Sequence, residues 1–233
     1  ARRDPQAERS ESGVSTAAQV SSFPRIGWLG ALWLLVYLPT YHAAYGAFNF
    51  LFLCNIGVIL TAIGLIARSR LLLSSQAVAA PVIALVWALD VGWKLATDDF
   101  LFGGASYMWD TAYPLFARLL SLYHIAWPLL LWYVLRRTGY DPRGWPLQAG
   151  IAALAILAGR LCVSASDNVN FAWIDPFFGR QLGPAPLHLL ICWGVLSGVA
   201  YGATHWGLRR LFPVPANANG QVRGSVPPHR VLP

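Results

Sequence analysis

Cys54 and His124 are the two side chains in this sequence whose types could form a nucleophile and its base. Cys54 follows Phe48 by six residues, and His124 follows Arg118 by six. At about 1.5 Å per helical residue, each lies about 9 Å inside its segment. A thiol beside an imidazole is the arrangement that activates a cysteine. We therefore predict Cys54 and His124 as catalytic residues. The alternative is that Cys54 packs as a small apolar side chain and His124 hydrogen-bonds between helices.

Asp90 and Lys94 are four residues apart near the end of a long apolar run, with the acid on the N-terminal side. This order favours a helical ion pair. Ionisable side chains at the edge of an apolar segment tend to pair, to reach for water or to serve a function, because burying them is costly. We predict an Asp90–Lys94 pair that either orients a polar headgroup or anchors the loop beginning at Ala96. The predicted substrate-binding residues are Asn55, Asp90, Lys94, Asp110 and Arg118.

The composition indicates that these residues belong to an integral membrane protein. Of the 233 residues, 56% are hydrophobic and 12% are charged, and the mean hydropathy is +0.49. A soluble domain carries roughly 25% charged residues. The net charge of +7 could suit nucleic acid. Its distribution along the chain argues for a lipid bilayer as partner and against nucleic acid.

Six apolar segments come close to the length needed to cross a membrane, about 17–25 residues. They lie near 27–46, 48–67, 71–94, 114–135, 147–163 and 187–207. We predict an all-α, polytopic membrane protein with six transmembrane helices. The expected organisation is a cytoplasmic polar tail over 1–25, a six-helix transmembrane domain over 26–212 and a disordered cytoplasmic tail over 213–233.

The basic residues predict the orientation. Thirteen of the 17 Lys and Arg residues fall before the first segment, after the second, fourth and sixth segments, or in the C-terminal tail. These regions share one side of the membrane. Because cytoplasmic loops are enriched in Lys and Arg, both termini are expected in the cytoplasm, with the chain in the cytoplasmic (inner) membrane.

The opposite side carries two long loops, near 96–113 and 164–185, that are acidic and aromatic. Their acids are Asp98, Asp99, Asp110, Asp167 and Asp175, against Arg180 as the one base. Loops of this length often form lids or binding elements, so we predict an aromatic-acidic extracytoplasmic cap. The alternative is an aromatic belt at the membrane surface.

Polar side chains of the segments gather in the half that faces these loops, which predicts a vestibule that opens outward. Two of them, His42 and His188, suggest haem ligation as a second chemical interpretation, although a solvated or interfacial role is the more common one. No cofactor follows from the sequence. Cys162 and Cys192 lie on the outer side, where a disulfide is chemically permitted, and spacing alone leaves their pairing open.

Gly194, Gly198 and Gly202 recur every four residues in the last segment. Small residues at this spacing form a smooth strip on which another transmembrane helix can pack closely. We therefore predict this strip as a binding face for partner membrane subunits.

Two stretches carry a resemblance to known proteins. The chain reads FNFLFLCN at 48–55 and LLSLYH at 119–124. With the overall run of apolar segments, they resemble a family of bacterial six-helix membrane-associated proteins that has no established activity. The layout is also similar, more distantly, to the androgen-induced-type intramembrane hydrolases and their acyltransferase relatives. That second resemblance implies Cys54 as nucleophile and His124 as base.

Two functions from different classes remain open at this point. In the first, the protein is an enzyme that acts on a lipid-like substrate, with Cys54 and His124 at the reacting bond. In the second, it is a non-catalytic subunit, or a lipid- or pigment-binding scaffold, of a larger membrane complex.

Overall fold

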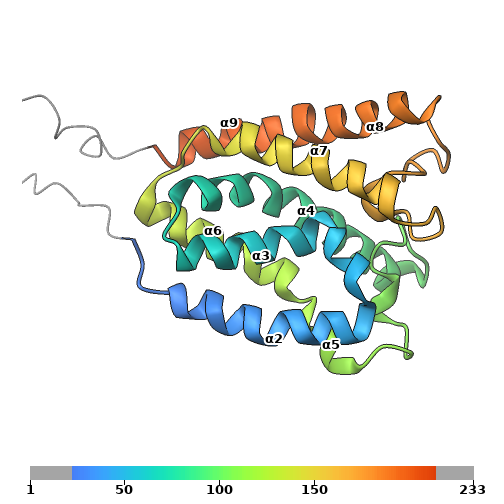
Figure 1. Cartoon of the computed structure of the whole chain (residues 1–233), viewed down its shortest axis with the longest axis horizontal. Helices are drawn as coiled ribbons and strands as arrows, with labels where there is room; N and C mark the ends of the chain where they lie inside the picture. Colours follow the sequence, from blue (N-terminus) through green and yellow to red (C-terminus); the bar gives the residue numbers. More distant parts are fainter. Residues whose placement is uncertain (1–22, 214–233) are drawn as a thin grey trace, which may run out of the picture.

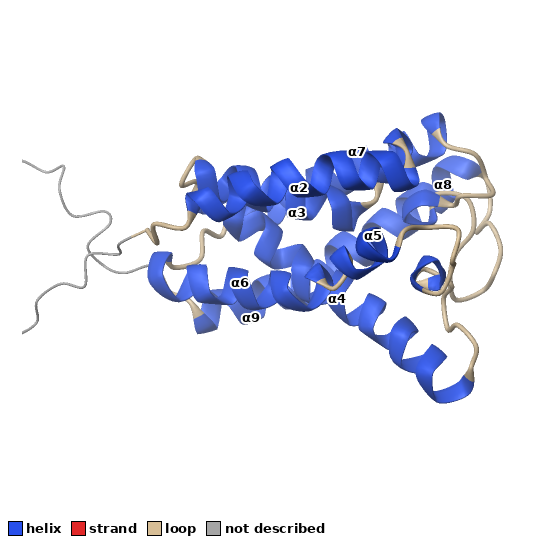
Figure 2. Ribbon diagram, turned by 90° about the horizontal axis from the view of Figure 1, so that it is seen from below, coloured by secondary structure: helices blue, strands red, loops and turns tan. Residues whose placement is uncertain are grey.

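The computed structural model describes residues 23–213 (Figure 1). Throughout this range the chain forms helices and loops without strands, so the all-α prediction is confirmed for the described residues (Figure 2). The predicted tails, 1–25 and 213–233, lie outside the described residues except for 23–25 and Pro213.

The helices follow the predicted apolar segments closely. They are α2 (Gly27–Tyr45), η1 (Ala47–Leu51), α3 (Leu53–Ile66), α4 (Arg70–Thr97), η2 (Ser106–Met108), α5 (Leu115–Leu120), α6 (Tyr123–Thr138), α7 (Gly144–Cys162), η3 (Val169–Phe171), α8 (Ala185–Gly194), η4 (Val195–Ala200) and α9 (Tyr201–Leu211). The first three η segments are short 3-10 helices, and η4 is a π-helical turn between α8 and α9.

Four helical stretches of the described chain are long and apolar enough to cross a membrane. They are Arg70–Thr97, Leu115–Thr138, Gly144–Cys162 and Ala185–Leu211. The helix Leu53–Ile66 is also apolar but has only 14 residues. Length and composition therefore support a membrane protein with several spanning helices.

Helix α4 lies at the centre of the bundle, where it packs against α3, α6, α7 and α9. Half of its most apolar window is buried inside the protein, the largest share among the four spanning candidates. Every residue from Leu73 to Ala80 is buried, and most of them are small. Small side chains allow neighbouring helices to approach from several directions, which explains how polar Ser74 and Gln76 come to be enclosed.

Glycines create the closest contacts between these helices. A Cβ on Gly57 of α3 would lie 2.3 Å from the Trp127 ring of α6, so the absent side chain makes the space that the indole occupies. A Cβ on Gly30 of α2 would lie 2.6 Å from the carbonyl oxygen of Ala62 in α3. The positions of α2, α3 and α6 therefore depend on glycine at these points.

Three of the predicted segments are interrupted. The second breaks at Phe52, whose backbone is extended between η1 and α3. The fourth breaks at a turn formed by Ser121 and Leu122, between α5 and α6. The last contains the π turn η4. Interrupted membrane helices are often found where backbone groups or side chains form a site.

The two ends of the bundle differ in loop length and charge. Short connections and the first and last described residues lie at one end, called the basic end here, and the long loops lie at the other (Figures 1 and 2). A hydrogen bond from Tyr140 N to Phe212 O, 2.9 Å long, joins the α6–α7 connection to the end of α9. The basic end carries Arg25, Arg68, Arg70, Arg136, Arg137, Arg143, Arg209 and Arg210.

Candidate functional site

The two predicted catalytic side chains take part in separate hydrogen bonds. Cys54 is half-buried, and its Sγ lies 3.5 Å from Oδ1 of Asn55. His124 is buried, and its Nδ1 lies 2.8 Å from the carbonyl oxygen of Ser121. Within residues 23–213, no hydrogen bond joins the Cys54 thiol to the His124 imidazole. The nucleophile–base pair therefore stays a prediction.

The break between α5 and α6 explains the position of His124. The turn leaves the Ser121 carbonyl at the start of α6, where it accepts a hydrogen bond from the backbone N–H of His124 as well as from the imidazole. Because a carbonyl only accepts, the imidazole proton is on Nδ1. The ring is stacked between Trp87 and Tyr123, at centroid distances of 4.9 and 4.2 Å. His124 is thus held firmly in one orientation.

Asn55 is the centre of the polar contacts in this region. Its Oδ1 accepts hydrogen bonds from the phenols of Tyr37, at 2.7 Å, and Tyr123, at 2.9 Å. Its Nδ2 donates to the carbonyl oxygen of Asn49, at 2.6 Å, in the 3-10 segment before the break. The amide therefore joins α2, η1, α3 and α6, and it is almost completely buried. Its predicted role in binding substrate stays a prediction.

A second set of hydrogen bonds continues toward the long loops. The hydroxyls of Tyr41 and Ser121 lie 2.5 Å apart, and the Trp87 indole donates to the Tyr107 hydroxyl at 3.2 Å. Tyr107 comes from the loop between α4 and α5 and reaches inward. Burial raises the pKa of its phenol well above the usual range, so Tyr107 is neutral. These contacts connect the loop to the bundle interior.

The predicted Asp90–Lys94 ion pair is wrong. Lys94 Nζ lies 2.8 Å from Oδ1 of Asp98 instead, and it also donates to the Asp98 carbonyl oxygen at 2.6 Å. Asp98 is exposed at the end of α4, so Lys94 can pair there and remain next to water. The hydrogen bond from Lys94 lowers the pKa of the Asp98 carboxyl.

Asp90 is buried, and its carboxylate holds the first long loop by the loop's backbone. Its Oδ1 accepts hydrogen bonds from the N–H groups of Phe102, at 2.8 Å, and Gly103, at 3.2 Å. Its Oδ2 accepts from the N–H of Ala105, at 2.7 Å. A carboxylate with three such donors compensates for its burial. The predicted role of Asp90 in anchoring the loop after Ala96 is confirmed.

The other two predicted binding residues contact the same loop separately. The Arg118 guanidinium donates to the Met108 carbonyl oxygen at 3.0 Å, and its buried Nε has no hydrogen-bond partner among residues 23–213. Asp110 is exposed, and its Oδ1 accepts from the backbone N–H of Ala112 at 2.9 Å. Arg118 therefore helps to hold the loop, and Asp110 stabilises a local turn.

Asn170, in the second long loop, is a key residue that the sequence analysis missed. Its Oδ1 accepts a hydrogen bond from the N–H of Leu53, at 2.9 Å, and its Nδ2 donates to the carbonyl oxygen of Leu51, at 2.8 Å. The amide thus satisfies backbone groups on both sides of the break at Phe52. The local signal was weak, because asparagine is common in loops; its left-handed backbone, with φ of 54°, appears only in the structure.

His188 supports the same loop and does not suit haem ligation. Its Nε2 donates to the Phe171 carbonyl oxygen at 3.0 Å, and its Nδ1 accepts from the Leu182 N–H at 3.2 Å. Both ring nitrogens are therefore occupied, whereas His42 is exposed on α2. The open question about the outer cysteines also has an answer, since Cys162 and Cys192 are both free.

Two open hollows of the described chain lie at the basic end, and neither is lined by these residues. One is lined by Arg25, Gly27, Trp28, Ala31, Ile66 and Arg68, and another by His205, Trp206, Arg209 and Arg210. The polar residues near the long loops contact one another and the loop backbones. Their arrangement immobilises the loops and the interrupted helices. It also places one thiol beside an imidazole, since Cys192 Sγ lies 3.7 Å from His188 Nε2.

Comparisons with known proteins assign the chain to no family. No family model matches the chain, and neither the curated proteins nor the solved structures contain a match to it. The two resemblances drawn from the sequence therefore stay predictions, and the function has to be inferred from the geometry described above.

Proposed function

We propose that the protein is a six-span scaffold of the cytoplasmic membrane that binds a transmembrane helix of a partner subunit. In this proposal α2, the η1–α3 pair, α4, the α5–α6 pair, α7 and the α8–α9 pair each cross the bilayer. Helix α2 has 19 residues, and η1 and α3 together cover 47–66, lengths that suit a span of about 17–25 residues.

The charge distribution supports cytoplasmic termini. At the basic end, Asp141 is the one acid beside eight arginines of the described chain. At the opposite end the six acids, Asp90 included, outnumber the four bases. The excess of Arg next to the membrane favours the cytoplasm for the basic end. The long loops, held by Asp90 and Asn170, then form the extracytoplasmic cap.

The glycine strip is the observation that carries the scaffold role. A Cβ built on Gly194, Gly198 or Gly202 would meet no atom of another helix within 4 Å among residues 23–213, so there is open space beside each of these glycines. The α8–α9 stretch lies along one edge of the bundle, and only 17% of its apolar window is buried, the smallest share among the spanning candidates (Figure 1). In lipid, a strip of this kind allows the close packing that drives helix association.

The hydrogen bonds made by the polar side chains support a structural role over catalysis. Asp90, Asn55 and Asn170 each use their side chains to hold backbone groups or other helices in place. His124 is fixed by Ser121 and by stacked aromatic rings. A catalytic base needs to reach a reacting proton within hydrogen-bonding distance. The hydrogen bond and the stacked rings that fix His124 therefore favour a structural role for it.

Photo-crosslinking in intact membranes tests the scaffold role. We expect a crosslinkable residue at Gly198 to capture a partner protein, whether a different subunit or a second copy of the chain. Gly150 on α7 is a matched control, because a Cβ there also meets no atom within 4 Å. Gly198→Leu should lower co-purification of the partner by at least about tenfold, while Gly150→Leu should leave it unchanged.

Two results would contradict the proposal. One is crosslinking at Gly198 to lipid alone, with no loss of any complex in Gly198→Leu. The other is covalent labelling of the purified protein by an acylating thiol probe that disappears in Cys54→Ala, because it would favour the enzyme interpretation.

A further inference from the structure

We propose that the hollow between the start of α2 and the end of α3 binds an anionic phospholipid, with its phosphate between Arg25 and Arg68. The hollow has a volume of about 420 Å³ and is open to its surroundings. Cavities of roughly 300–1,000 Å³ accommodate small organic ligands. The six residues that line it, given above, include two arginines and one tryptophan.

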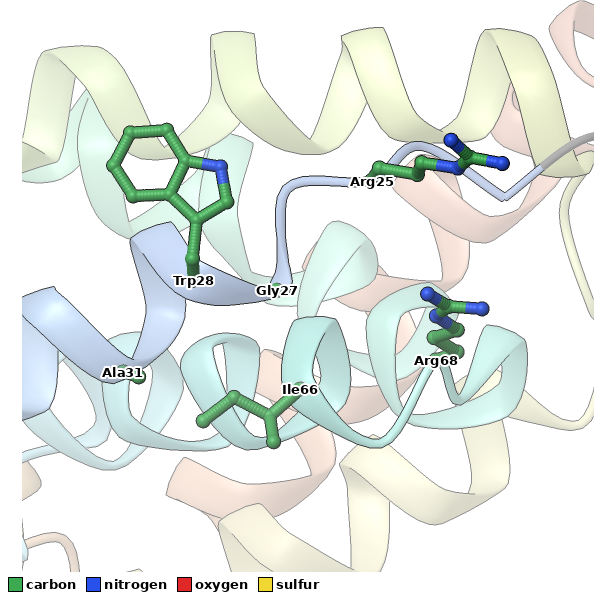
Figure 3. Close-up of a pocket in the computed structure, with 6 residues that line it drawn as sticks. All are labelled: Arg25, Gly27, Trp28, Ala31, Ile66 and Arg68. Carbon is green, nitrogen blue, oxygen red and sulfur yellow. The ribbon is translucent and has the colours of Figure 1, made fainter.

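The hollow is polar at one end and apolar at the other (Figure 3). The Arg25 and Arg68 side chains lie beyond the helix ends, while Trp28 and Ala31 lie in the first turns of α2 and Ile66 is the last residue of α3. This is the polarity of a phospholipid at a membrane surface, whose phosphate lies outside its acyl chains. Tryptophan is also enriched at the level of the headgroups.

The two guanidinium groups are available for an anion. Within the described part of the chain, Arg25 and Arg68 have no ion pair with a carboxylate, whereas Arg143 at the same end lies 2.7 Å from Asp141. A guanidinium binds phosphate oxygens through paired N–H donors. Two of them at one hollow therefore favour a phosphate-containing ligand.

The backbone at Arg68 is a second, independent sign that its side chain has a role. Helix α3 ends in the motif that usually carries glycine: Ser69 N donates to Gly64 O at 2.9 Å, and Arg68 N donates to Leu65 O at 3.4 Å. Arg68 is the left-handed residue of this motif, with φ of 51°. A side chain costs backbone energy in that conformation, and glycine would avoid the cost. Arg68 therefore makes this backbone less stable than glycine would, and its charged side chain lines the hollow.

The apolar half of the hollow favours a lipid over free phosphate. Trp28 is 63% exposed, and Ile66 is 49% exposed. An acyl chain would cover both, whereas a free phosphate ion would leave them bare. This inference depends on the membrane orientation proposed above, because anionic lipids concentrate in the cytoplasmic leaflet. It does not depend on the partner-binding role of the glycine strip.

Native mass spectrometry of the full-length protein tests the inference, with phosphatidylglycerol and phosphatidylcholine of matched chain length as the two probes. We expect one tightly retained phosphatidylglycerol and no equivalent phosphatidylcholine. Arg68→Gly should weaken its binding about fivefold, and Arg25→Gln with Arg68→Gly about thirtyfold. Arg68→Gly also relieves the backbone, so its thermal stability should equal or exceed that of the parent protein. Loss of lipid then cannot be attributed to unfolding.

Arg136→Gln is the matched control, since Arg136 is at the same end and lies over the Trp132 ring, away from the hollow. It should change retention by less than about twofold. Equal losses in Arg136→Gln and Arg68→Gly would overturn the site in favour of diffuse surface charge. Displacement of the lipid by millimolar inorganic phosphate would overturn the lipid assignment. The Gly198→Leu variant should retain phosphatidylglycerol as the parent protein does. A failure of the lipid site can therefore be distinguished from a failure of the proposed partner-binding role.

Discussion

The side-chain oxygen of Asn170 accepts a hydrogen bond from the backbone N–H of Leu53 at 2.9 Å, across 117 residues of sequence. Leu53 is the first residue of α3, where backbone N–H groups have no partner within the helix. Asn170 therefore acts like a capping residue supplied by a distant loop. The second long loop and the interrupted second segment are stabilised by the same contact.

Removing this amide should destabilise the protein. Asn170→Gly keeps the left-handed backbone but loses the side chain, so we expect the free energy of unfolding to fall by about 1–2 kcal/mol. Asn170→Ala should cost about 1 kcal/mol more, because alanine disfavours that backbone. Denaturant unfolding in detergent micelles measures both. Gln181→Ala, an exposed change in the same loop, should stay within about 0.5 kcal/mol, and an Asn170→Gly protein as stable as this control would contradict the capping role.

Asp90→Asn should release the first long loop. An amide has one acceptor oxygen where the carboxylate has two, and its NH₂ group would face the N–H of Ala105 or Phe102. We expect a loss of about 1–3 kcal/mol and faster hydrogen exchange at the Phe102 and Ala105 amides. Asp98→Asn removes an exposed pair with Lys94 and should change neither quantity appreciably. Unchanged exchange in Asp90→Asn would show that other contacts hold the loop.

Gly57→Ala should force the Trp127 ring out of its position. The new Cβ would lie 2.3 Å from the indole, whose Nε1 donates to Thr61 Oγ1 at 2.8 Å. Overpacking of this kind costs about 1–3 kcal/mol, which thermal unfolding would detect as a lower midpoint. Gly150→Ala, made in open space on α7, should be neutral or stabilise by up to about 1 kcal/mol. Equal midpoints for the two variants would argue against the close α3–α6 contact.

The α6–α7 connection should give the protein a stability that is lost in acid. The hydrogen bonds from Arg143 lower the pKa of the Asp141 carboxyl below its ordinary value of 3.8. A lowered pKa in the folded state means that the contribution is complete above the ordinary value and disappears as the pH falls through the folded value. Acid unfolding of Asp141→Asn should lack this component. If the free energy of unfolding depended on pH in the same way below pH 4 for the parent protein and the variant, the prediction would be contradicted.

The fold class and the charge distribution are determined by the sequence itself. A run of apolar residues and the position of an arginine are local properties, so the predicted segment 71–94 corresponds well to α4 at Arg70–Thr97. The anchoring role of Asp90 was also predictable, because a carboxylate at the end of an apolar run needs a partner. The partner of Lys94 was not predictable, because Asp90 and Asp98 are each four residues away from it. The structure shows that Asp98 forms the ion pair.

Only the tertiary structure decided how the interrupted helices are completed and which polar groups meet. The break at Phe52 is filled by Asn170, and the Asn55 amide bonds to tyrosines of α2 and α6. These contacts join residues far apart in the chain. Whether such hydrogen bonds form depends on atomic positions to within a few tenths of an ångström, which residue spacing does not determine. For the same reason, depth along a helix placed Cys54 and His124 at one level but could not say which way either side chain points.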